Sequence, residues 1–187
     1  MLPTMTRPLR KDAADRRAAL LRAAADVFAE EGIETPLDRI AERAGVGRAT
    51  LYRNFASRTE IALAVLMAEV DALGDRFAAP DGPEAFLDFL SALSATLERN
   101  AALGGVVRAA PSPDLLDPLR AALLKAAMPS LTVSQAAGVV RPDIGSADIR
   151  ILSAMLGSAL HNAAPAERNA IAGRTLKLVI DAVRARP

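Results

Sequence analysis

Apolar residues recur at helical spacing through most of this 187-residue chain. Apolar positions at i, i+3, i+4 and i+7 lie on one face of an α-helix. No alternating β-branched run of convincing length occurs, and aromatic residues make up only 3%. The pattern therefore predicts an all-α protein. Helical segments are expected over residues 12–31, 36–44, 48–55, 58–78, 83–100, 146–162 and 165–184, with a helix or helix pair over residues 114–137. Residues 103–110 are expected to be a short segment with a loose or strained turn near Gly104 and Gly105.

Breaks in this pattern indicate how the chain is organised. The first three helices are predicted to form an N-terminal domain over residues 1–57, with residues 58–187 forming a bundle of about six helices. The polar, basic residues 1–11 are expected to be a disordered arm. Pro129 should kink or split the helix in which it lies, because its ring clashes with the preceding turn.

The segment that begins at Thr35 is predicted to be a short, capped helix. Thr35 is a suitable N-cap, and Pro36 can occupy the first helical position without losing a hydrogen bond. Asp38, three residues after Thr35, would complete a capping box. One face of this helix is apolar, with the residues Leu37, Ile40, Ala41 and Ala44.

A tight turn and a second helix follow. Gly45 fits the left-handed position that ends a helix, and Gly47 can cap the next one. In residues 48–55, Leu51 and Phe55 are four apart and should face inward. Two helices joined by a glycine-containing turn of about three residues form a helix-turn-helix, whose second helix enters the major groove of DNA. The next helix, expected over residues 58–78, should be capped by Ser57, with a capping box closed by Glu60.

The charges of this segment fit a surface that faces phosphate. Between Ala44 and Thr59 every charged residue is an arginine. Neutralising phosphates with such side chains releases counterions and favours binding. Arg, Thr and Asn can also reach base edges, and a tyrosine hydroxyl can bond phosphate. The predicted DNA-facing residues are Thr35, Arg48, Ala49, Thr50, Tyr52, Arg53, Asn54 and Arg58.

These residues are expected to have different roles. We assign Tyr52 and Arg58 to phosphate, and Arg48 and Asn54 to bases. Ala49 is small enough to let the helix approach the bases closely. The basic arm is either a solvated tail or a source of extra phosphate or minor-groove contacts.

The same segment resembles the TetR family of bacterial transcriptional regulators. The detailed match covers roughly residues 15–65, and the rest is similar only in length and helical character. Gly47 stands where the family often has Ser, Arg58 where it often has Lys, and Pro36 where a hydroxyl often contacts phosphate. The matching residues are Leu37, Ile40, Ala41, Ala44, Gly45, Val46, Gly47, Thr50, Leu51, Tyr52, Phe55 and Arg58.

The resemblance implies a sequence-specific regulator that works as a homodimer on double-stranded DNA. It favours a repressor that a small molecule releases from a palindromic operator. The last two helices have long apolar faces that could complete a monomer core or pair across a two-fold axis, and the resemblance favours pairing. The predicted interface residues are Leu152, Leu156, Ala159, Leu176, Val179 and Val183.

A pocket for a small effector is expected between residues 63 and 160. The helix over residues 58–78 is apolar on most sides, so it should be buried and could transmit the signal to the DNA-binding head. The apolar surroundings suggest an apolar or amphipathic ligand. The predicted lining residues are Met67, Phe86, Phe89, Leu93, Leu103, Val107, Leu123 and Met155.

Composition argues against other classes of protein. Cysteine is absent and His161 is the one histidine, so neither a metal site nor a catalytic constellation is expected. No cofactor is implied, and the protein is not expected to be an enzyme. His161 is predicted to be structural, with ligand binding or pH sensing as the alternative.

Two further observations limit the choice of function. No apolar stretch reaches the ~18 residues of a membrane span, and the polar N-terminus is not a secretory signal, so we expect a cytoplasmic protein. The formal net charge of +1 would not by itself indicate DNA binding. The main rival is an all-helical protein-interaction scaffold without DNA binding. The ordered caps and the acid-free stretch from Ala44 to Thr59 favour the regulator.

Overall fold

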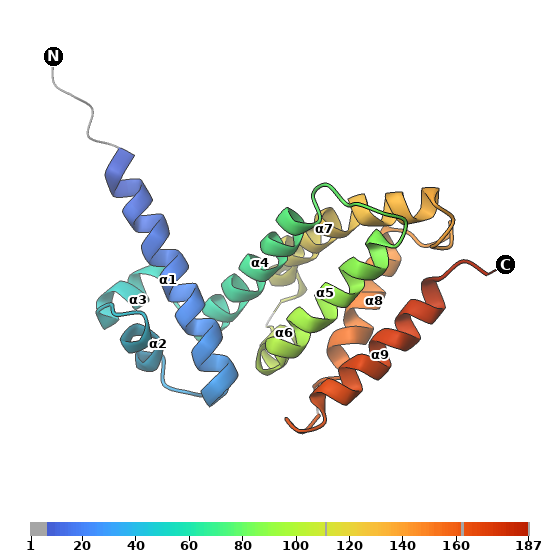
Figure 1. Cartoon of the computed structure of the whole chain (residues 1–187). Coiled ribbons are helices and arrows are strands. Elements are labelled where there is room, and N and C mark those ends of the chain that lie inside the picture. The colour runs from blue at the N-terminus through green and yellow to red at the C-terminus, as the bar shows by residue number, and fades with distance from the viewer. Residues whose placement is uncertain (1–6, 111, 162, 187) are drawn as a thin grey trace, which may run out of the picture. The chain divides into compact units, whose positions relative to one another are not determined.

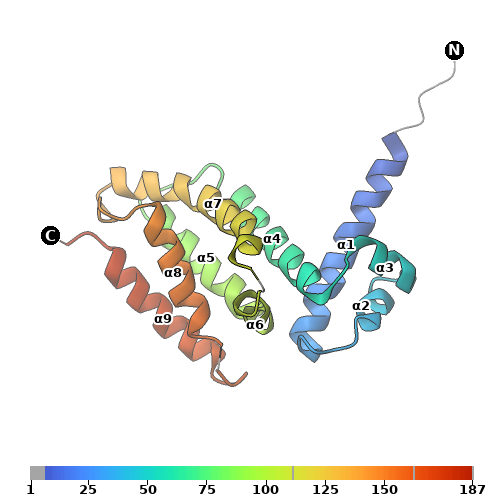
Figure 2. The same ribbon diagram turned by 180° about the vertical axis from the view of Figure 1, so that it is seen from behind.

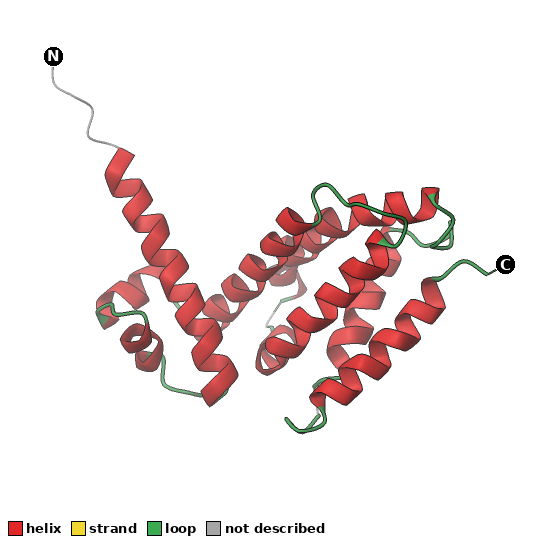
Figure 3. Ribbon diagram, viewed as in Figure 1, coloured by secondary structure: helices red, strands yellow, loops and turns green. Residues whose placement is uncertain are grey.

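The computed structural model describes residues 7–110, 112–161 and 163–186. These residues form helices joined by loops, without a β-strand among them (Figures 1 and 3). The prediction of an all-α fold is confirmed. The α-helices are α1 (Arg7–Glu31), α2 (Asp38–Arg43), α3 (Arg48–Asn54), α4 (Arg58–Arg76), α5 (Ala85–Arg99), α6 (Gly104–Arg108), α7 (Asp117–Ala136), α8 (Ser146–Ser158) and α9 (Arg168–Val183), with 3₁₀ turns at Ala101–Leu103 and Pro113–Leu116.

The chain divides into two compact units, Met1–Val65 and Leu66–Pro187. The division falls within α4, whereas the predicted boundary between residues 57 and 58 lies at the start of that helix. Each unit has its own buried apolar residues, so each is described separately. The predicted domain boundary remains a prediction.

The first helix is longer than the sequence pattern predicted. It begins at Arg7 instead of residue 12, so residues 7–11 are helical, and residues 1–6 of the predicted arm lie outside the described residues. Pro8 is tolerated because it lies in the first turn, and the following Arg, Lys and Ala residues are good helix formers. The buried face includes Leu20, Ala24 and Phe28, while Leu21 and Ala25 are only half-buried.

The N-terminal unit is held together by apolar side chains from α1, α2, α3 and the start of α4. Ile40 of α2, Leu51 of α3 and Ile61 of α4 are completely buried, and Phe28 and Phe55 are nearly so. This core fixes α3 against α1 and α2, as the apolar spacing predicted. The guanidinium of Arg17 lies 4.6 Å from the centre of the Phe55 ring, a favourable cation–π distance.

The two predicted capping boxes of this unit turn out differently. At α2 the prediction was wrong: the helix begins at Asp38, and the Thr35 hydroxyl donates to the Glu31 carboxylate at 2.9 Å. A charged acceptor makes a stronger hydrogen bond than a neutral backbone partner does, which favours this alternative. At α4 the Ser57 hydroxyl accepts from the Glu60 N–H at 3.1 Å, as predicted. The Glu60 carboxylate accepts from Ala56 N–H at 2.7 Å, one residue earlier than in a standard box.

In the second unit, α5 packs against α7, α8 and α9 (Figure 2). The rings of Phe86 and Phe89 on α5 are stacked with their centres 6.2 Å apart, and Phe77 meets Phe89 edge-on at 5.4 Å. The backbone N–H of Phe86 donates to the buried Ser134 hydroxyl of α7 at 2.9 Å. Buried side chains of α7, α8 and α9 complete this core, among them Leu131, Leu156 and Val179.

The helix α7 runs continuously through Pro129 and ends before Gly138, which has φ +72°. The structure therefore excludes the predicted split at Pro129. Packing of α7 against α5 and α8 keeps it helical although the proline removes one backbone hydrogen bond.

The last two helices begin close to the predicted positions. Gly145, and not Ser146, is the N-cap of α8, and its N–H donates to the Asp148 carboxylate at 2.8 Å. The carboxylate thus satisfies a backbone donor at the helix start. Helix α9 begins at Arg168, after a turn that follows the predicted start at Pro165.

Candidate nucleic-acid interface

The turn between α2 and α3 has the hydrogen bonds of a Schellman motif. Gly45 has φ +66°. The N–H of Gly45 donates to Glu42 O at 3.1 Å, and the N–H of Val46 donates to Ala41 O at 3.0 Å, which is the pairing expected of this helix end. Gly47 then caps α3 with an extended backbone. The predicted helix-turn-helix is therefore present, and the hydrogen bonds that shape its turn join residues close together in the sequence.

Helix α3 divides into a buried face and an exposed face. Leu51 and Phe55 point into the core, with 0% and 2% of their surface exposed. Thr50 and Asn54 are half-buried. The exposed residues of α3 are Arg48, Ala49, Tyr52 and Arg53. Tyr52 is 53% exposed, which is unusual for an aromatic side chain without a partner surface.

Side chains on α3 also bond one another. The Arg53 guanidinium donates to the Thr50 hydroxyl at 3.1 Å, and the Asn54 amide donates to the Thr50 carbonyl at 2.8 Å. The amide nitrogen of Asn54 is therefore occupied by its own helix. Its carbonyl oxygen can still accept a hydrogen bond from a base.

Arg48, one of the two predicted base-reading residues, forms an ion pair with Asp38 of α2. The guanidinium and carboxylate are 3.0 Å apart, and the two side chains are 72% and 30% exposed. Exposed pairs of this kind contribute only about 0–1 kcal/mol. A nucleic acid could therefore displace Asp38 from Arg48 at little cost. Asp38 was not predicted to touch a functional residue, because its spacing suggested only a helix cap.

Arg58 and Thr35 lie differently from what the sequence predicted. The Arg58 guanidinium donates to the backbone carbonyl of Thr35 at 2.7 Å and to that of Ile33. Thr35 is only 8% exposed, and its hydroxyl is bonded to Glu31. Both side chains thus join the α1–α2 loop to the neighbouring helices. A direct contact of either side chain with DNA stays a prediction.

Three acidic residues between the arm and α3, namely Glu30, Glu31 and Glu42, are paired with arginines of α2. Arg39 bonds Glu31 at 3.2 Å and Glu42 at 2.8 Å, and Arg43 bonds Glu30 at 2.7 Å. The hydrogen bond from Arg43 lowers the pKa of Glu30, and the hydrogen bond from Arg39 lowers that of Glu31. These pairs attach the end of α1 to α2.

Acid should weaken this attachment. A carboxylate whose pKa is lowered in the folded protein stabilises it above the unfolded pKa, and this stability is lost as pH falls through the lower, folded pKa. We expect the melting temperature of the wild type to fall more between pH 6 and pH 3 than that of the double variant Glu30→Gln and Glu31→Gln. Calorimetry at a series of pH values measures this difference. Equal falls in the two proteins would contradict the role of these pairs.

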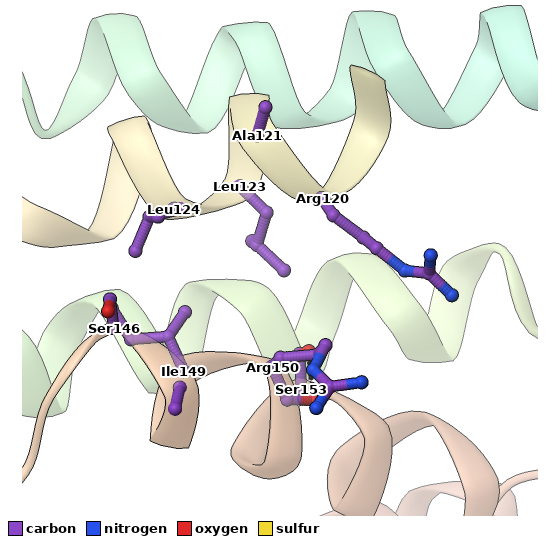
Figure 4. Close-up of a pocket in the computed structure, with 9 residues that line it drawn as sticks. Arg120, Ala121, Leu123, Leu124, Ser146, Ile149, Arg150 and Ser153 are labelled. Atoms are coloured by element: carbon purple, nitrogen blue, oxygen red, sulfur yellow. Dashed lines mark hydrogen bonds between the residues drawn. The ribbon is translucent and has the colours of Figure 1, made fainter. Parts of the chain in front are cut away.

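The structure places the residues of the predicted effector pocket in different surroundings, and the pocket itself stays a prediction. Four of its residues, Phe86, Phe89, Leu93 and Leu103, are buried in the packed interior of the second unit. Met67 and Val107 are half-buried and line neither of two surface hollows found on α7 and α8. Leu123 lines one hollow, between α7 and α8 (Figure 4), and Met155 lines the other. Helical spacing alone could not separate core residues from pocket residues.

The residues of the predicted dimer interface also differ in their surroundings, and the interface stays a prediction. The buried residues among them are Leu152, Leu156, Val179 and Val183, which all lie in the core of the second unit. Ala159 and Leu176 are half-buried. The large apolar residues exposed on α8 and α9 are instead Ile151, Met155 and Leu178, with 51%, 43% and 50% exposure. The i, i+4 spacing of Ile151 and Met155 was the available signal for this second face.

The described residues contain no group of three or more His, Asp or Glu side chains placed to hold a metal ion. None of the described helices is long and apolar enough to cross a membrane. His161 lies against Arg108, whose guanidinium contacts its Nδ1 atom. This contact joins α6 to the end of α8.

Comparison with known proteins agrees with the helix-turn-helix. Residues 20–65 match the family model described as bacterial regulatory proteins, tetR family. The transcriptional activator FasR of Mycolicibacterium smegmatis is 47% identical over 60 residues, which are 32% of this chain and 27% of FasR. A transcriptional regulator of Staphylococcus aureus is 36% identical over 64 residues, or 34% of this chain and 35% of that protein. These curated relatives are thus matched over about a third of their length.

Two solved structures are similar over nearly the whole chain. A TetR transcription regulatory protein from Mycobacterium vanbaalenii has a TM-score of 0.68 and 30% identity, over 95% of this chain and 100% of that one. A TetR transcriptional regulator from Streptomyces coelicolor has a TM-score of 0.67 and 32% identity, over 91% and 99% of the two chains. On this evidence, the chain belongs to the TetR family of bacterial regulatory proteins.

Proposed function

We propose that this protein is a sequence-specific, DNA-binding regulator of transcription whose helix α3 enters the major groove. The observation that carries the proposal is the exposed face of α3, where two arginines and a tyrosine surround a small alanine. Arginine supplies charge and base contacts, and Ala49 permits close approach. The proposed site of action is the cytoplasm, where a bacterial regulator meets DNA.

The roles of individual residues follow from their geometry. Arg48 exchanges Asp38 for a base edge, and Tyr52 donates its hydroxyl to a phosphate. Asn54 contacts a base through its carbonyl oxygen, since its amide nitrogen already bonds the Thr50 carbonyl. Arg58 acts indirectly, by holding the loop in front of α2. These assignments keep the predicted division between base and phosphate contacts, except at Arg58.

A symmetric homodimer completes the proposal. Two copies would pair through the exposed faces of α8 and α9, where Ile151, Met155 and Leu178 leave apolar surface in contact with water. Paired heads would read a palindrome whose half-sites lie ~34 Å apart, or a multiple of that distance. An effector that binds more tightly when the two DNA-binding domains are arranged differently weakens the binding of DNA. By linkage, DNA weakens the binding of the effector by the same factor. Repression relieved by such an effector is the proposed mode of regulation.

Fluorescence anisotropy on the DNA upstream of the protein's own gene tests this proposal. Wild-type protein should bind this DNA more tightly than random DNA. Tyr52→Ala should weaken binding at least about tenfold, which is ~1.4 kcal/mol, because it removes a phosphate contact from an exposed position. Arg22→Ala, an exposed arginine of α1 outside the proposed interface, is the matched control and should bind nearly as the wild type does.

The alternative of an interaction scaffold predicts a different result. The regulator proposal would be contradicted if binding were weak, did not depend on the DNA sequence and were unchanged by Tyr52→Ala. The same must hold for genomic fragments recovered by pull-down. Steep salt dependence alone would not support it, because non-specific binding to phosphates has the same dependence.

A further inference from the structure

The second unit has a pocket between α7 and α8 with a volume of about 270 Å³. Its walls come from the first half of α7 and from most of α8 (Figure 4). At ~30 Å³ for each water molecule in the liquid, this is the volume of about nine waters. A molecule with about ten non-hydrogen atoms is therefore in scale with the pocket.

Apolar side chains form the centre of this pocket. Leu123 and Leu124 of α7 are half-buried and face Ile149 of α8, which is 4% exposed (Figure 4). A hydrocarbon chain placed between them would remove apolar surface from water, at a gain of about 25 cal/mol per Å². Small residues, Ala121 and Ala147, keep the walls thin.

Positive charge lies beside this apolar centre. Arg120 of α7 and Arg150 of α8 both line the pocket, and their guanidinium groups extend to the same side of Figure 4. The nine lining residues include no acidic residue. Such a pair can bind the two oxygens of a carboxylate or the oxygens of a phosphate through charge-assisted hydrogen bonds.

The two guanidinium groups differ in their ion pairs. Arg120 pairs with Asp117 at 2.9 Å, but the two side chains are 41% and 65% exposed, and exposed pairs contribute about 0–1 kcal/mol. The Arg150 guanidinium forms no ion pair with any residue in the described part of the chain. An anionic ligand at Arg150 would therefore have no ion partner among the described residues to displace.

We propose that this pocket binds the effector, and that the effector is a small amphipathic anion with a carboxylate or phosphate head and a short apolar tail. The head lies between Arg120 and Arg150, and the tail lies against Leu123, Leu124 and Ile149. The regulatory part of this inference rests on the proposed function. The binding part does not, because it concerns the second unit alone.

Octanoate and octyl phosphate are suitable probes. Two control ligands separate the parts of the probe: 1-octanol has the apolar tail without the charged head group, and inorganic phosphate has the charged group without the tail. Isothermal titration calorimetry with the full-length protein, in the absence of DNA, should show that at least one of the two amphiphiles binds and that 1-octanol and inorganic phosphate bind at least about tenfold more weakly. Comparison of octanoate with octyl phosphate identifies the preferred head group. Arg150→Gln should weaken the binding of the amphiphile about tenfold or more, because it removes one charge-assisted hydrogen bond.

Arg174→Gln, an exposed arginine of α9 outside the pocket, is the matched control and should bind the amphiphile as the wild type does. Ser153→Leu should also reduce binding, because it fills the pocket without changing its charge. The inference is overturned if neither amphiphile binds at millimolar concentration, if 1-octanol binds equally well, or if the Arg120→Gln and Arg150→Gln double variant binds unchanged.

The two proposals fail in different ways. If the amphiphile binds through Arg150 but Tyr52→Ala leaves DNA binding unchanged, the pocket stands and the DNA-reading role of α3 fails. If operator binding is lost in Tyr52→Ala but no amphiphile binds, the regulator stands and the pocket assignment fails. Release of wild-type protein from operator DNA by the amphiphile, absent in Arg150→Gln, supports both.

Discussion

Replacing Arg58 with alanine should lower the free energy of unfolding of the N-terminal unit by roughly 2–4 kcal/mol, because hydrogen bonds to charged groups contribute about 1.5–3 kcal/mol each. The guanidinium donates to the carbonyls of Ile33 and Thr35, in the loop that leads into α2. The variant leaves both carbonyls without this donor and releases the loop from the start of α4. Urea unfolding followed by circular dichroism measures the loss, and hydrogen exchange of the α2 and α3 amides localises it.

Arg58→Lys is the informative control, since one ammonium can retain part of this bonding. We expect a smaller loss of stability than with alanine. At a temperature where Arg58→Ala remains folded, its DNA affinity should fall without a change in the slope of log affinity against log salt. If the slope of log affinity against log salt became shallower by about 1 while the stability was unchanged, the result would support the direct contact between Arg58 and phosphate that the sequence suggested.

Gly45→Val is expected to destabilise the same unit by more than about 1 kcal/mol, since a left-handed residue with a β-carbon costs about 1–2 kcal/mol. Gly45 has φ +66°, and among the described atoms nothing lies within 4 Å of a β-carbon added there. The cost therefore comes from backbone strain and not from a clash. The strain would disturb the Schellman bonds that set the angle between α2 and α3. The melting temperature and operator affinity should fall together.

Gly47→Ser provides a matched control two residues away. Gly47 also has free space around an added β-carbon, but its φ of −70° and ψ of 149° suit any residue. Serine is a slightly better N-cap than glycine, so this variant should be neutral or more stable by a few tenths of a kcal/mol. If Gly45→Val melts at the wild-type temperature, the argument from the left-handed turn is wrong.

Several features of this protein could be read from neighbouring residues. The turn between α2 and α3 depends on Gly45 and Gly47, whose backbone preferences act over a few residues. The inward positions of Leu51 and Phe55 follow from helical periodicity in a segment with two clear ends. The cap at Ser57 is equally local. For these features the sequence needed no information about distant parts of the chain.

The helix boundaries were less well determined. The pattern placed the start of α1 at residue 12, although helix-forming residues extend it to Arg7. At α2, the Thr35 hydroxyl had two possible partners, the backbone ahead of it and Glu31 behind it. Only the packing of the loop against α1 decides between these two hydrogen bonds.

Tertiary structure alone decided which functional role the more distant residues can take. Arg58 meets the carbonyls of Ile33 and Thr35 across more than twenty residues of chain, and no local pattern reports such a partner. Helices α8 and α9 each carry apolar residues on more than one side, so periodicity could not tell that Leu152 and Val179 face the protomer's own core while Ile151 and Leu178 face water. The sequence determines a helix and its turn through short-range backbone preferences. The choice of buried face, pocket and partner depends on which helices pack together, because burial is a property of the assembled core and not of any single segment.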